Sequence, residues 1–585
     1  MFAVLKKLSW FFKENWQRYA IAITLLILVG ILDVIPPKLI GLAIDDIHEG
    51  SISNKKIIQY LGILLAIMVS SYAITYIWMY RLFGGAFLIE RKLRSRFVAH
   101  LLKMTPIFYE KNRTGDLMAR ATNDLKAISI TAGFGILTLV DSSVWMLTLL
   151  LTMGILISWK LTLAAIIPLP IMAILMQMYG KRIHTRFMEA QDAFGELNDR
   201  VLESVAGVRV IRAFVQESAD SKRFHQLTED VYYKNINVAK IDALFDPTIK
   251  VLVGISYLIG LGYGAYLVFH QSITLGNLVS FNVYLGMLIW PMFAIGELIN
   301  VMQRGNASLD RVNETLSYQE EVVNPLSPVS IPRADQIDYR KVTFRYPSSK
   351  NVNLHQVNVR LLQGQTLGIV GKTGSGKTTF IKQLLRQYPL GDGEVSISGV
   401  SLDKQTLDQV RDWIGYVPQD HVLFSRSVKE NILFGSKDAS EEELEEAIDL
   451  AAFRKDLALL PEGLSTLVGE KGVALSGGQK QRISIARALI KNPEILILDD
   501  SLSAVDAKTE KRIIDNIRKV RNDKTTIITT HRMSAVQHAD HIIVLDDGKI
   551  VEEGTHEQLL EHDGWYREQF IRQQIAGNIE EEVQA

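Results

Sequence analysis

The chain of 585 residues is 48% hydrophobic and 22% charged, which is too apolar for a purely soluble enzyme and too charged for a protein buried wholly in lipid. Its 64 Lys and Arg residues balance 64 Asp and Glu residues, so the net charge points to no nucleic acid partner. The absence of cysteine excludes disulfides, cysteine nucleophiles and thiolate metal sites.

Long apolar segments occur only in the first half of the chain. With their small polar residues and a few lone acids included, they approach the roughly 20 helical residues that cross a bilayer core. Buried helices of a soluble protein are the alternative, but such helices normally alternate with charged faces at helical spacing. The sequence predicts six transmembrane helices, at 19–32, 57–78, 134–157, 161–178, 251–269 and 278–302.

The distribution of Lys and Arg predicts the orientation of these helices. The connection after the second segment is rich in both residues, whereas the connection after the first has only Lys55 and Lys56 beside Asp45, Asp46 and Glu49. The positive-inside bias then places both termini in the cytoplasm of a multi-pass protein of the plasma (inner) membrane. The first segment is long and lacks a small-residue cleavage site, so we do not expect it to be a cleaved signal peptide.

Two predicted cytoplasmic connections, 81–133 and 180–246, are much longer than the outer ones. Apolar residues recur in them every three or four positions, which indicates amphipathic helices that continue from the membrane. Their tips, near 113–121 and 208–215, are free to contact another part of the protein.

A proline-containing stretch separates the apolar half from the rest. Pro325, Pro328 and Pro332 indicate a linker at 320–336, between a membrane domain at 1–319 and a second domain at 337–575. In the second domain short β-type runs alternate with helical ones, which predicts an α/β fold with a largely parallel sheet. Residues 576–585, with three consecutive glutamates, are predicted to be a solvated acidic tail.

A P-loop stands in its required context in the second domain. The apolar strand 366–370 precedes it and a helical segment follows. The glycines allow backbone N–H groups to face phosphate oxygens, and the helix N-terminus adds positive charge. Kinases and GTPases share this loop, so it predicts a nucleoside triphosphate site without deciding the family. Its residues are Gly371, Lys372, Thr373, Gly374, Ser375, Gly376, Lys377 and Thr378, followed by Thr379.

Further motifs decide the family. They are Leu475-Ser476-Gly477-Gly478-Gln479, Arg487-Ala488-Leu489, Ile495-Leu496-Ile497-Leu498-Asp499, Ser503-Ala504-Val505-Asp506 and Thr530-His531. In this order and spacing the chain resembles an ABC (ATP-binding-cassette) half-transporter, a bacterial exporter of the multidrug type and a subunit of a heterodimeric exporter in particular. The resemblance implies a polytopic α-helical membrane domain of six transmembrane helices, type IV exporter-like, followed by an α/β P-loop ABC ATPase domain.

The resemblance also implies roles for single residues in binding ATP and Mg²⁺. Tyr346 would stack on adenine; the alternative is a core tyrosine of a strand. Lys377 would meet the β- and γ-phosphates, and Thr378, Gln419 and Asp499 would hold Mg²⁺. His531 would contact the γ-phosphate, although a histidine at a strand end is more often structural.

Ser476, Gly477, Gly478 and Gln479 precede a helix and so form a second N-terminal anion site. In the family this signature closes on the nucleotide of a partner cassette. One chain with one cassette would therefore need a second half-transporter, either a copy of itself or a related chain.

Asp500 departs from the family pattern, which has glutamate after the strand-end aspartate. Asp is shorter by one carbon–carbon bond, about 1.5 Å, while a catalytic base must lie about 2.6 to 3.2 Å from its proton donor. The site on this chain should bind ATP well and hydrolyse it poorly, whereas its signature would complete an active site on a partner that retains Glu. A slow homodimer, in which Asp500 reaches the water by a shifted backbone, is the alternative.

The cytoplasmic tips and the intramembrane acids are less specific signals. The tips resemble the coupling helices of the family; plain amphipathic surface helices are the alternative. Asp33, Asp141 and Glu297 are costly in lipid and should face the interior or pair, which makes organic cations a candidate cargo. Asp33 would alternatively pair with Lys38, and Glu297 would lie outside the membrane.

Two classes of function follow. The first is ATP-driven export of hydrophobic, including cationic, drugs or other amphiphiles. The second is a membrane ATPase that senses or gates without net transport; a homodimeric exporter of lipids or peptides is a further alternative. The absence of inserted peptidase or regulatory segments favours export.

Overall fold

The computed structural model describes residues 3–469 and 475–584, with side chains up to residue 575. The chain forms two compact units. The first comprises residues 1–102 and 114–318, and the second comprises residues 103–113 and 319–585. The expected acidic tail continues the backbone of α26 (Trp565–Gln584), and its side chains lie outside the described residues.

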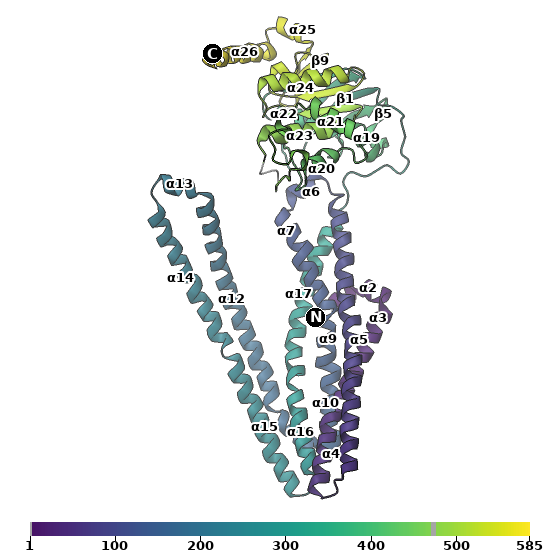
Figure 1. Ribbon diagram of the computed structural model, residues 1–585, viewed down its shortest axis with the longest axis vertical. Coiled ribbons are helices and arrows are strands. Elements are labelled where there is room, and N and C mark those ends of the chain that lie inside the picture. Colours follow the sequence, from purple (N-terminus) through teal and green to yellow (C-terminus); the bar gives the residue numbers. More distant parts are fainter. Residues whose placement is uncertain (1–2, 470–474, 585) are drawn as a thin grey trace. The chain divides into compact units, whose positions relative to one another are not determined.

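The first unit is helical throughout its described part (Figure 1). Three short π-helical stretches interrupt its central helices: η1 (Arg120–Asp124), η2 (Asp141–Trp145) and η3 (Gly154–Ser158). The α-helices are α1 (Ala3–Lys7), α2 (Ser9–Glu14), α3 (Trp16–Asp33), α4 (Ile35–His48), α5 (Asn54–Leu101), α7 (Thr114–Ala119), α8 (Leu125–Ala132), α9 (Phe134–Val140), α10 (Met146–Met153), α11 (Trp159–Ile166), α12 (Pro168–Ala206), α13 (Val208–Ala213), α14 (Glu217–Asp242), α15 (Phe245–Phe269), α16 (Leu275–Met287) and α17 (Ile289–Ser317).

By length and composition, five helical segments in the described residues could cross a membrane. They are Trp16–His48, Asn54–Leu101, Thr114–Ile166, Glu217–Phe269 and Leu275–Ser317. The six expected segments thus do not all recur: the fourth, 161–178, is divided between α11 and α12. The division falls at Ile167, before Pro168, because proline lacks the N–H that would continue the helix.

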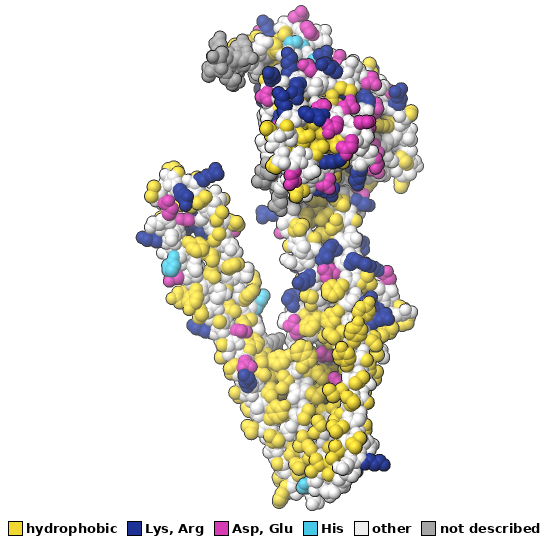
Figure 2. Space-filling view, viewed as in Figure 1, with side chains coloured by type: hydrophobic (Ala, Val, Ile, Leu, Met, Phe, Trp, Pro, Cys, Tyr) yellow, Lys and Arg dark blue, Asp and Glu magenta, His cyan; other side chains and the backbone are white. Residues whose placement is uncertain are grey.

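The long helices match the amphipathic connections expected from the sequence. The 48 residues of α5 extend about 70 Å at 1.5 Å per residue, more than twice a bilayer core of about 30 Å. Figure 2 shows hydrophobic side chains crowding one end of these helices and charged side chains toward the other. Helices α12 and α14 run side by side (Figure 1), and α13 and α14 bury none of their described residues.

Polar contacts fix helix pairs within the first unit. Asp45 of α4 accepts hydrogen bonds from the Thr274 hydroxyl at 2.6 Å and the Gly276 N–H at 2.7 Å. Asp124 of η1 accepts from the Ser308 hydroxyl and from the Arg311 Nε, both at 2.9 Å. Hydrogen bonds thus compensate the half-buried Asp45 and the buried Asp124, as burial of a charge requires.

The described residues of the second unit form two sheets. One is antiparallel with the order β2-β1-β4-β5. The other has the order β10-β9-β3-β8-β7-β6 and is parallel except for β10. The strands are β1 (Gln336–Phe344), β2 (Leu354–Leu362), β3 (Thr366–Gly371), β4 (Asp392–Ile397), β5 (Val400–Ser401), β6 (Ile414–Val417), β7 (Ile495–Asp499), β8 (Thr525–Thr529), β9 (His541–Asp546) and β10 (Lys549–Gly554).

Helices surround these sheets. The α-helices are α6 (Pro106–Lys111), α18 (Lys377–Leu384), α19 (Leu407–Asp412), α20 (Val428–Leu433), α21 (Glu441–Leu450), α22 (Arg454–Leu457), α23 (Gly477–Leu489), α24 (Ala507–Val520), α25 (His556–Glu561) and α26. The parallel α/β core expected from the sequence is confirmed; the antiparallel sheet was not predicted.

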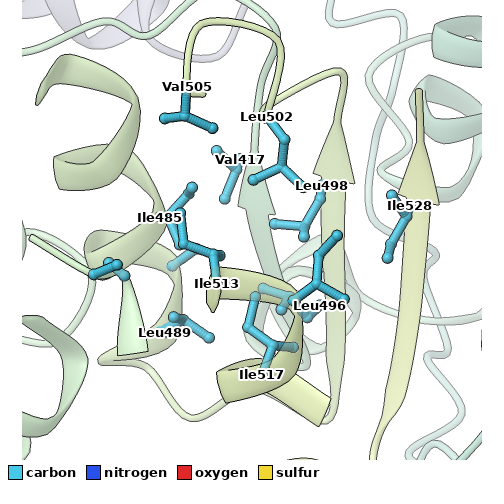
Figure 3. Packing of buried hydrophobic residues seen from close by; sticks show 14 of the residues in the cluster. Val417, Ile485, Leu489, Leu496, Leu498, Leu502, Val505, Ile513, Ile517 and Ile528 are labelled. Atoms are coloured by element: carbon cyan, nitrogen blue, oxygen red, sulfur yellow. The ribbon is translucent and has the colours of Figure 1, made fainter. Parts of the chain in front are cut away.

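Both faces of the parallel sheet are buried. In β7, Leu496 and Leu498 belong to one hydrophobic cluster and Ile495 and Ile497 to the other. Figure 3 shows the first cluster, in which β7 packs with side chains of α23 and α24. Two covered faces explain the nearly continuous apolar run of β7. The carboxyl ends of the parallel strands β3, β6, β7 and β8 lie together at one edge of this sheet.

Candidate nucleotide-binding site

The loop between β3 and α18 requires glycine at three positions. Gly371, Gly374 and Gly376 have φ angles of +144°, +84° and +105°. A Cβ on Gly371 would lie 2.1 Å from the Leu545 carbonyl oxygen, and a Cβ on Gly376 would lie 2.7 Å from that of Asn353. Only glycine combines these backbone angles with such close approach. The loop is therefore held in one shape by its neighbours.

The loop leaves polar groups available to an anion. Ser375 is 3% exposed, and its hydroxyl has no hydrogen-bond partner in the described part of the chain. The Lys377 Nζ donates to the carbonyls of Gly371 at 2.9 Å and Lys372 at 2.8 Å. Burial lowers the pKa of the Lys377 ammonium, and the carboxylates of Asp500 and Asp499 oppose that shift. A phosphate chain would compensate both the buried hydroxyl and the ammonium.

Asp499, the last residue of β7, is 1% exposed and surrounded by hydroxyl groups. Its carboxylate accepts from Thr529 at 2.6 Å, from Thr378 at 3.1 Å and from Tyr416 at 3.3 Å. Carboxylate and hydroxyl oxygens are ligands that Mg²⁺ prefers. No three Asp, Glu, His or Cys side chains in the described ranges form a metal cluster, so a Mg²⁺ ion here would also use substrate and water oxygens, as it usually does.

Asp500 lies directly beyond the strand in a left-handed conformation, with φ +47°. Its N–H donates to the Thr529 carbonyl at 2.9 Å. Burial raises the pKa of the Asp500 carboxyl, and the charges of His531 and Lys377 oppose that rise. Backbone strain and a shifted pKa at one residue are common at functional sites.

The other predicted site residues differ in how directly they contact the P-loop and the strand ends beside it. The Tyr346 hydroxyl donates to the Thr379 Oγ1 at 3.1 Å, next to the loop. His531 is half-buried and follows β8, whereas Gln419 lies exposed in the loop after β6. The contacts of these residues with nucleotide stay predictions.

The signature residues cap α23. The Ser476 hydroxyl accepts from the Gln479 N–H at 3.3 Å, and the Gln479 side-chain oxygen accepts from the Ser476 N–H at 2.9 Å. This reciprocal pair fixes the start of a 13-residue helix. Gly477 and Gly478 form its first turn, where N–H groups have no partner within the helix.

Comparison with known proteins identifies this architecture. Residues 19–292 match the family described as "ABC transporter transmembrane region", and residues 354–503 match the family described as "ABC transporter". The chain is 64% identical to the "Probable multidrug resistance ABC transporter ATP-binding/permease protein YheI" of Bacillus subtilis, over 98% of each chain. The chain belongs to the ABC transporter family.

Other relatives agree with this assignment. The transporter is 41% identical to the "Multidrug resistance-like ATP-binding protein MdlA" of Escherichia coli, over 98% of this chain and 97% of that one. The structure of a bacterial Atm1-family ABC exporter with ATP bound superposes with a TM-score of 0.75 at 26% identity, covering 95% of this chain and 98% of the other. A membrane domain followed by an ATP-binding ABC ATPase domain is thus the architecture of the transporter.

The transporter also has a contact at its ATPase domain that the sequence did not identify. Helix α6 belongs to the second unit, where Ile107 is 2% exposed in the hydrophobic core. The Glu110 carboxylate accepts from the Tyr388 hydroxyl at 2.7 Å and from the Ser348 hydroxyl at 3.3 Å. The Tyr388 ring lies edge-on to Tyr346 at 4.9 Å between centroids.

The contact therefore lies a few residues before the expected tip. The prediction placed it near 113–121, but α7 in that range belongs to the first unit, and the contact is made by α6. Pro106 at the first position of α6 and the apolar Ile107 beside it were the available signals.

Proposed function

We propose that the transporter is one half of a bacterial exporter that uses ATP to move hydrophobic amphiphiles, including drugs, out of the plasma membrane. One observation carries the proposal: a single chain combines helices that could span a membrane with a P-loop whose shape requires glycine. Beside that loop lies the buried Asp499, whose carboxylate accepts hydrogen bonds from hydroxyl groups. The names of the relatives YheI and MdlA, which describe multidrug resistance, support drugs as the cargo. Lys and Arg in the connections support cytoplasmic termini.

The loop N–H groups, Ser375 and Lys377 would bind the phosphates, and Tyr346 would contact the adenine. Thr378, Asp499 and Gln419 would hold Mg²⁺, which when bound neutralises phosphate charge. His531 would donate to the γ-phosphate. His531 is half-buried and interacts electrostatically with the Asp500 carboxyl, which supports that role.

A second half-transporter would supply the other cassette. The proposal rests on the N-terminal turn of α23, whose N–H groups face no partner within the helix and suit a phosphate, and on α13 and α14, which bury none of their described residues within the chain. Because Asp500 stands where the family has glutamate, we propose a partner that retains Glu, with the weaker hydrolytic site on this chain.

Transport in inverted membrane vesicles tests the proposal. Vesicles that contain the transporter and its partner should accumulate a fluorescent amphiphile when ATP is added, and vesicles with Lys377→Ala should not. The absence of ATP-dependent accumulation would contradict export and favour a sensing or gating ATPase. Accumulation by the transporter alone at the full rate would contradict the need for a different partner.

A further inference from the structure

The ATPase unit contains a cavity of about 220 Å³ that no P-loop residue lines. Its walls come from α24, β3, β7, β8 and the segment before β9. Figure 3 shows its apolar side, where Leu498 and Ile528 lie on neighbouring strands and Ile517 lies on a helix beside them. The volume is below the range of about 300 to 1,000 Å³ for drug-sized ligands, so the cavity suits a molecule of a few heavy atoms.

The opposite side of the cavity is polar, although it adjoins a hydrophobic core. Thr526 precedes Ile528 by two residues on β8, so both side chains point to the same face of the sheet. Thr526 is 4% exposed, and its hydroxyl makes no hydrogen bond in the described part of the chain. The side chain of Asn522, which also lines the cavity, has no partner among the described residues either. Buried polar groups such as the Thr526 hydroxyl rarely lack a partner unless a ligand or water meets them.

Arg521, directly after α24, adds a buried positive charge and is 7% exposed. Its guanidinium donates only to carbonyls, those of Pro493 at 2.8 Å, Thr525 at 3.1 Å and Glu494 at 3.4 Å, and its Nε has no partner in the described structure. Two of its five N–H donors are therefore unused. Burial lowers the pKa of Arg521 to about 10, against the charges of Glu494 and Asp523, so the side chain stays charged at neutral pH. A buried charge without an ion-pair partner is costly unless an anion compensates it.

Arg518, His538 and Asp540 complete the titratable groups of the lining. Arg518 is exposed and makes no hydrogen bond or ion pair within the described ranges. Burial lowers the pKa of His538, Arg518 lowers it further, and the charges of Asp515 and Asp540 oppose the shift, so the ring is neutral at pH 7. Asp540 accepts a hydrogen bond from the Thr366 N–H at 2.7 Å. Two guanidiniums thus face one carboxylate, and the lining carries one net positive charge.

We propose that this cavity binds a small monocarboxylate, held by the guanidinium fork of Arg518 and by an unused donor of Arg521, with its polar body against Thr526 and Asn522. The planar guanidinium matches the two oxygens of a carboxylate, and a single negative charge balances the lining. A phosphate dianion would leave surplus negative charge beside Asp540. A metal cation would face two guanidiniums and would find one carboxylate where it needs about six oxygen ligands. The site is separate from the proposed ATP site and does not rest on the proposed function.

The test compares L-lactate with L-lactamide, an uncharged molecule of nearly the same shape, and with inorganic phosphate. Binding is measured by ligand-observed NMR titration of the full-length chain in lipid nanodiscs. Saturating ADP with Mg²⁺ occupies the P-loop, and empty nanodiscs are the blank. Lactate should bind saturably, and lactamide at least tenfold more weakly. Arg518→Gln breaks no hydrogen bond of the described structure and should raise the Kd for lactate about tenfold, which corresponds to 1.4 kcal/mol.

Arg512→Gln is the matched control, because Arg512 is exposed on the same helix, makes no hydrogen bond or ion pair in the described residues and does not line the cavity. It should leave the Kd for lactate within twofold. Four results would overturn the proposal: no saturable binding of lactate, equal affinity for lactamide, unchanged lactate binding in Arg518→Gln, or an equal loss in Arg512→Gln. Binding of phosphate that depends on Arg518 and is tighter than that of lactate would also overturn it.

Discussion

The ATPase unit and the membrane unit both bury aspartates, but they support these residues differently. Asp499 is enclosed by three hydroxyl donors at the end of a parallel sheet. In the membrane unit, Asp141 has one indole donor and Asp33 has no partner in the described residues. The ATPase site is built from backbone and short loops that tolerate little change. In the membrane unit, a cavity of about 330 Å³ lined by Asp33 and Asp141 is built from side chains of separate helices.

The largest expected effect concerns the signature. Ser476→Arg would place a bulky cation at the start of α23, where the partner's nucleotide would bind. ATPase activity of the purified complex should fall at least about 100-fold, as removal of one transition-state donor costs in other enzymes. ATP should still bind this chain, as measured by photolabelling.

Ser440→Arg is the matched control for that variant, because Ser440 caps α21 with the same reciprocal pair, to Glu443. Loss of an N-cap costs about 1 kcal/mol of stability in either case. Equal loss of ATPase in both variants, or normal turnover with Ser476→Arg, would show that the signature is only a helix cap.

A smaller effect is expected at the P-loop lysine. Lys377→Ala removes the ammonium that would meet the phosphates, and charged hydrogen bonds contribute about 1.5 to 3 kcal/mol. ATP affinity of this chain should fall about 10- to 100-fold in a nucleotide-binding titration. Lys549→Ala, at an exposed position of β10, should leave the affinity unchanged. An unaltered affinity with Lys377→Ala would remove the phosphate-binding role of the loop.

The contrast between the units also decides what the sequence could predict. The P-loop and Asp499 are contiguous motifs whose geometry follows from glycine angles and strand ends, so their grouping at one sheet edge was expected and found. The partnership of Glu110 with Tyr388 joins residues 278 positions apart, and no local pattern encodes it. The partner of Asp141 likewise depends on how distant helices pack, whereas the break at Ile167 follows from the neighbouring Pro168.

Glu110 links α6 to the nucleotide edge, so its variant tests whether that contact transmits a signal. Glu110→Gln keeps the shape but weakens the hydrogen bond from Tyr388 by about 0.5 to 1.5 kcal/mol. Stimulation of ATPase by transported amphiphiles should fall about two- to fivefold, while basal ATPase stays. Lys111→Ala, at an equally exposed neighbour on the same helix that makes no hydrogen bond or ion pair in the described residues, should preserve stimulation. Unchanged stimulation in Glu110→Gln would make the contact purely structural.

The smallest expected effect tests the central proposal, which is that a complex with a second half-transporter would have two unequal ATP sites. General-base assistance is worth about 10² to 10⁴ in rate. Asp500 is one bond shorter than glutamate and has a backbone fixed by Thr529, so this assistance should already be absent at its site. Its replacement should therefore change the turnover of the complex little.

Steady-state ATPase of the purified complex is the direct measurement, with Asp500→Ala in this chain compared against removal of the partner chain's glutamate. The account predicts less than a twofold change for Asp500→Ala and at least a 100-fold loss for the partner variant. Comparable losses in both variants, or full ATPase from this chain alone, would contradict the unequal sites and favour a slow homodimer in which Asp500 itself activates water.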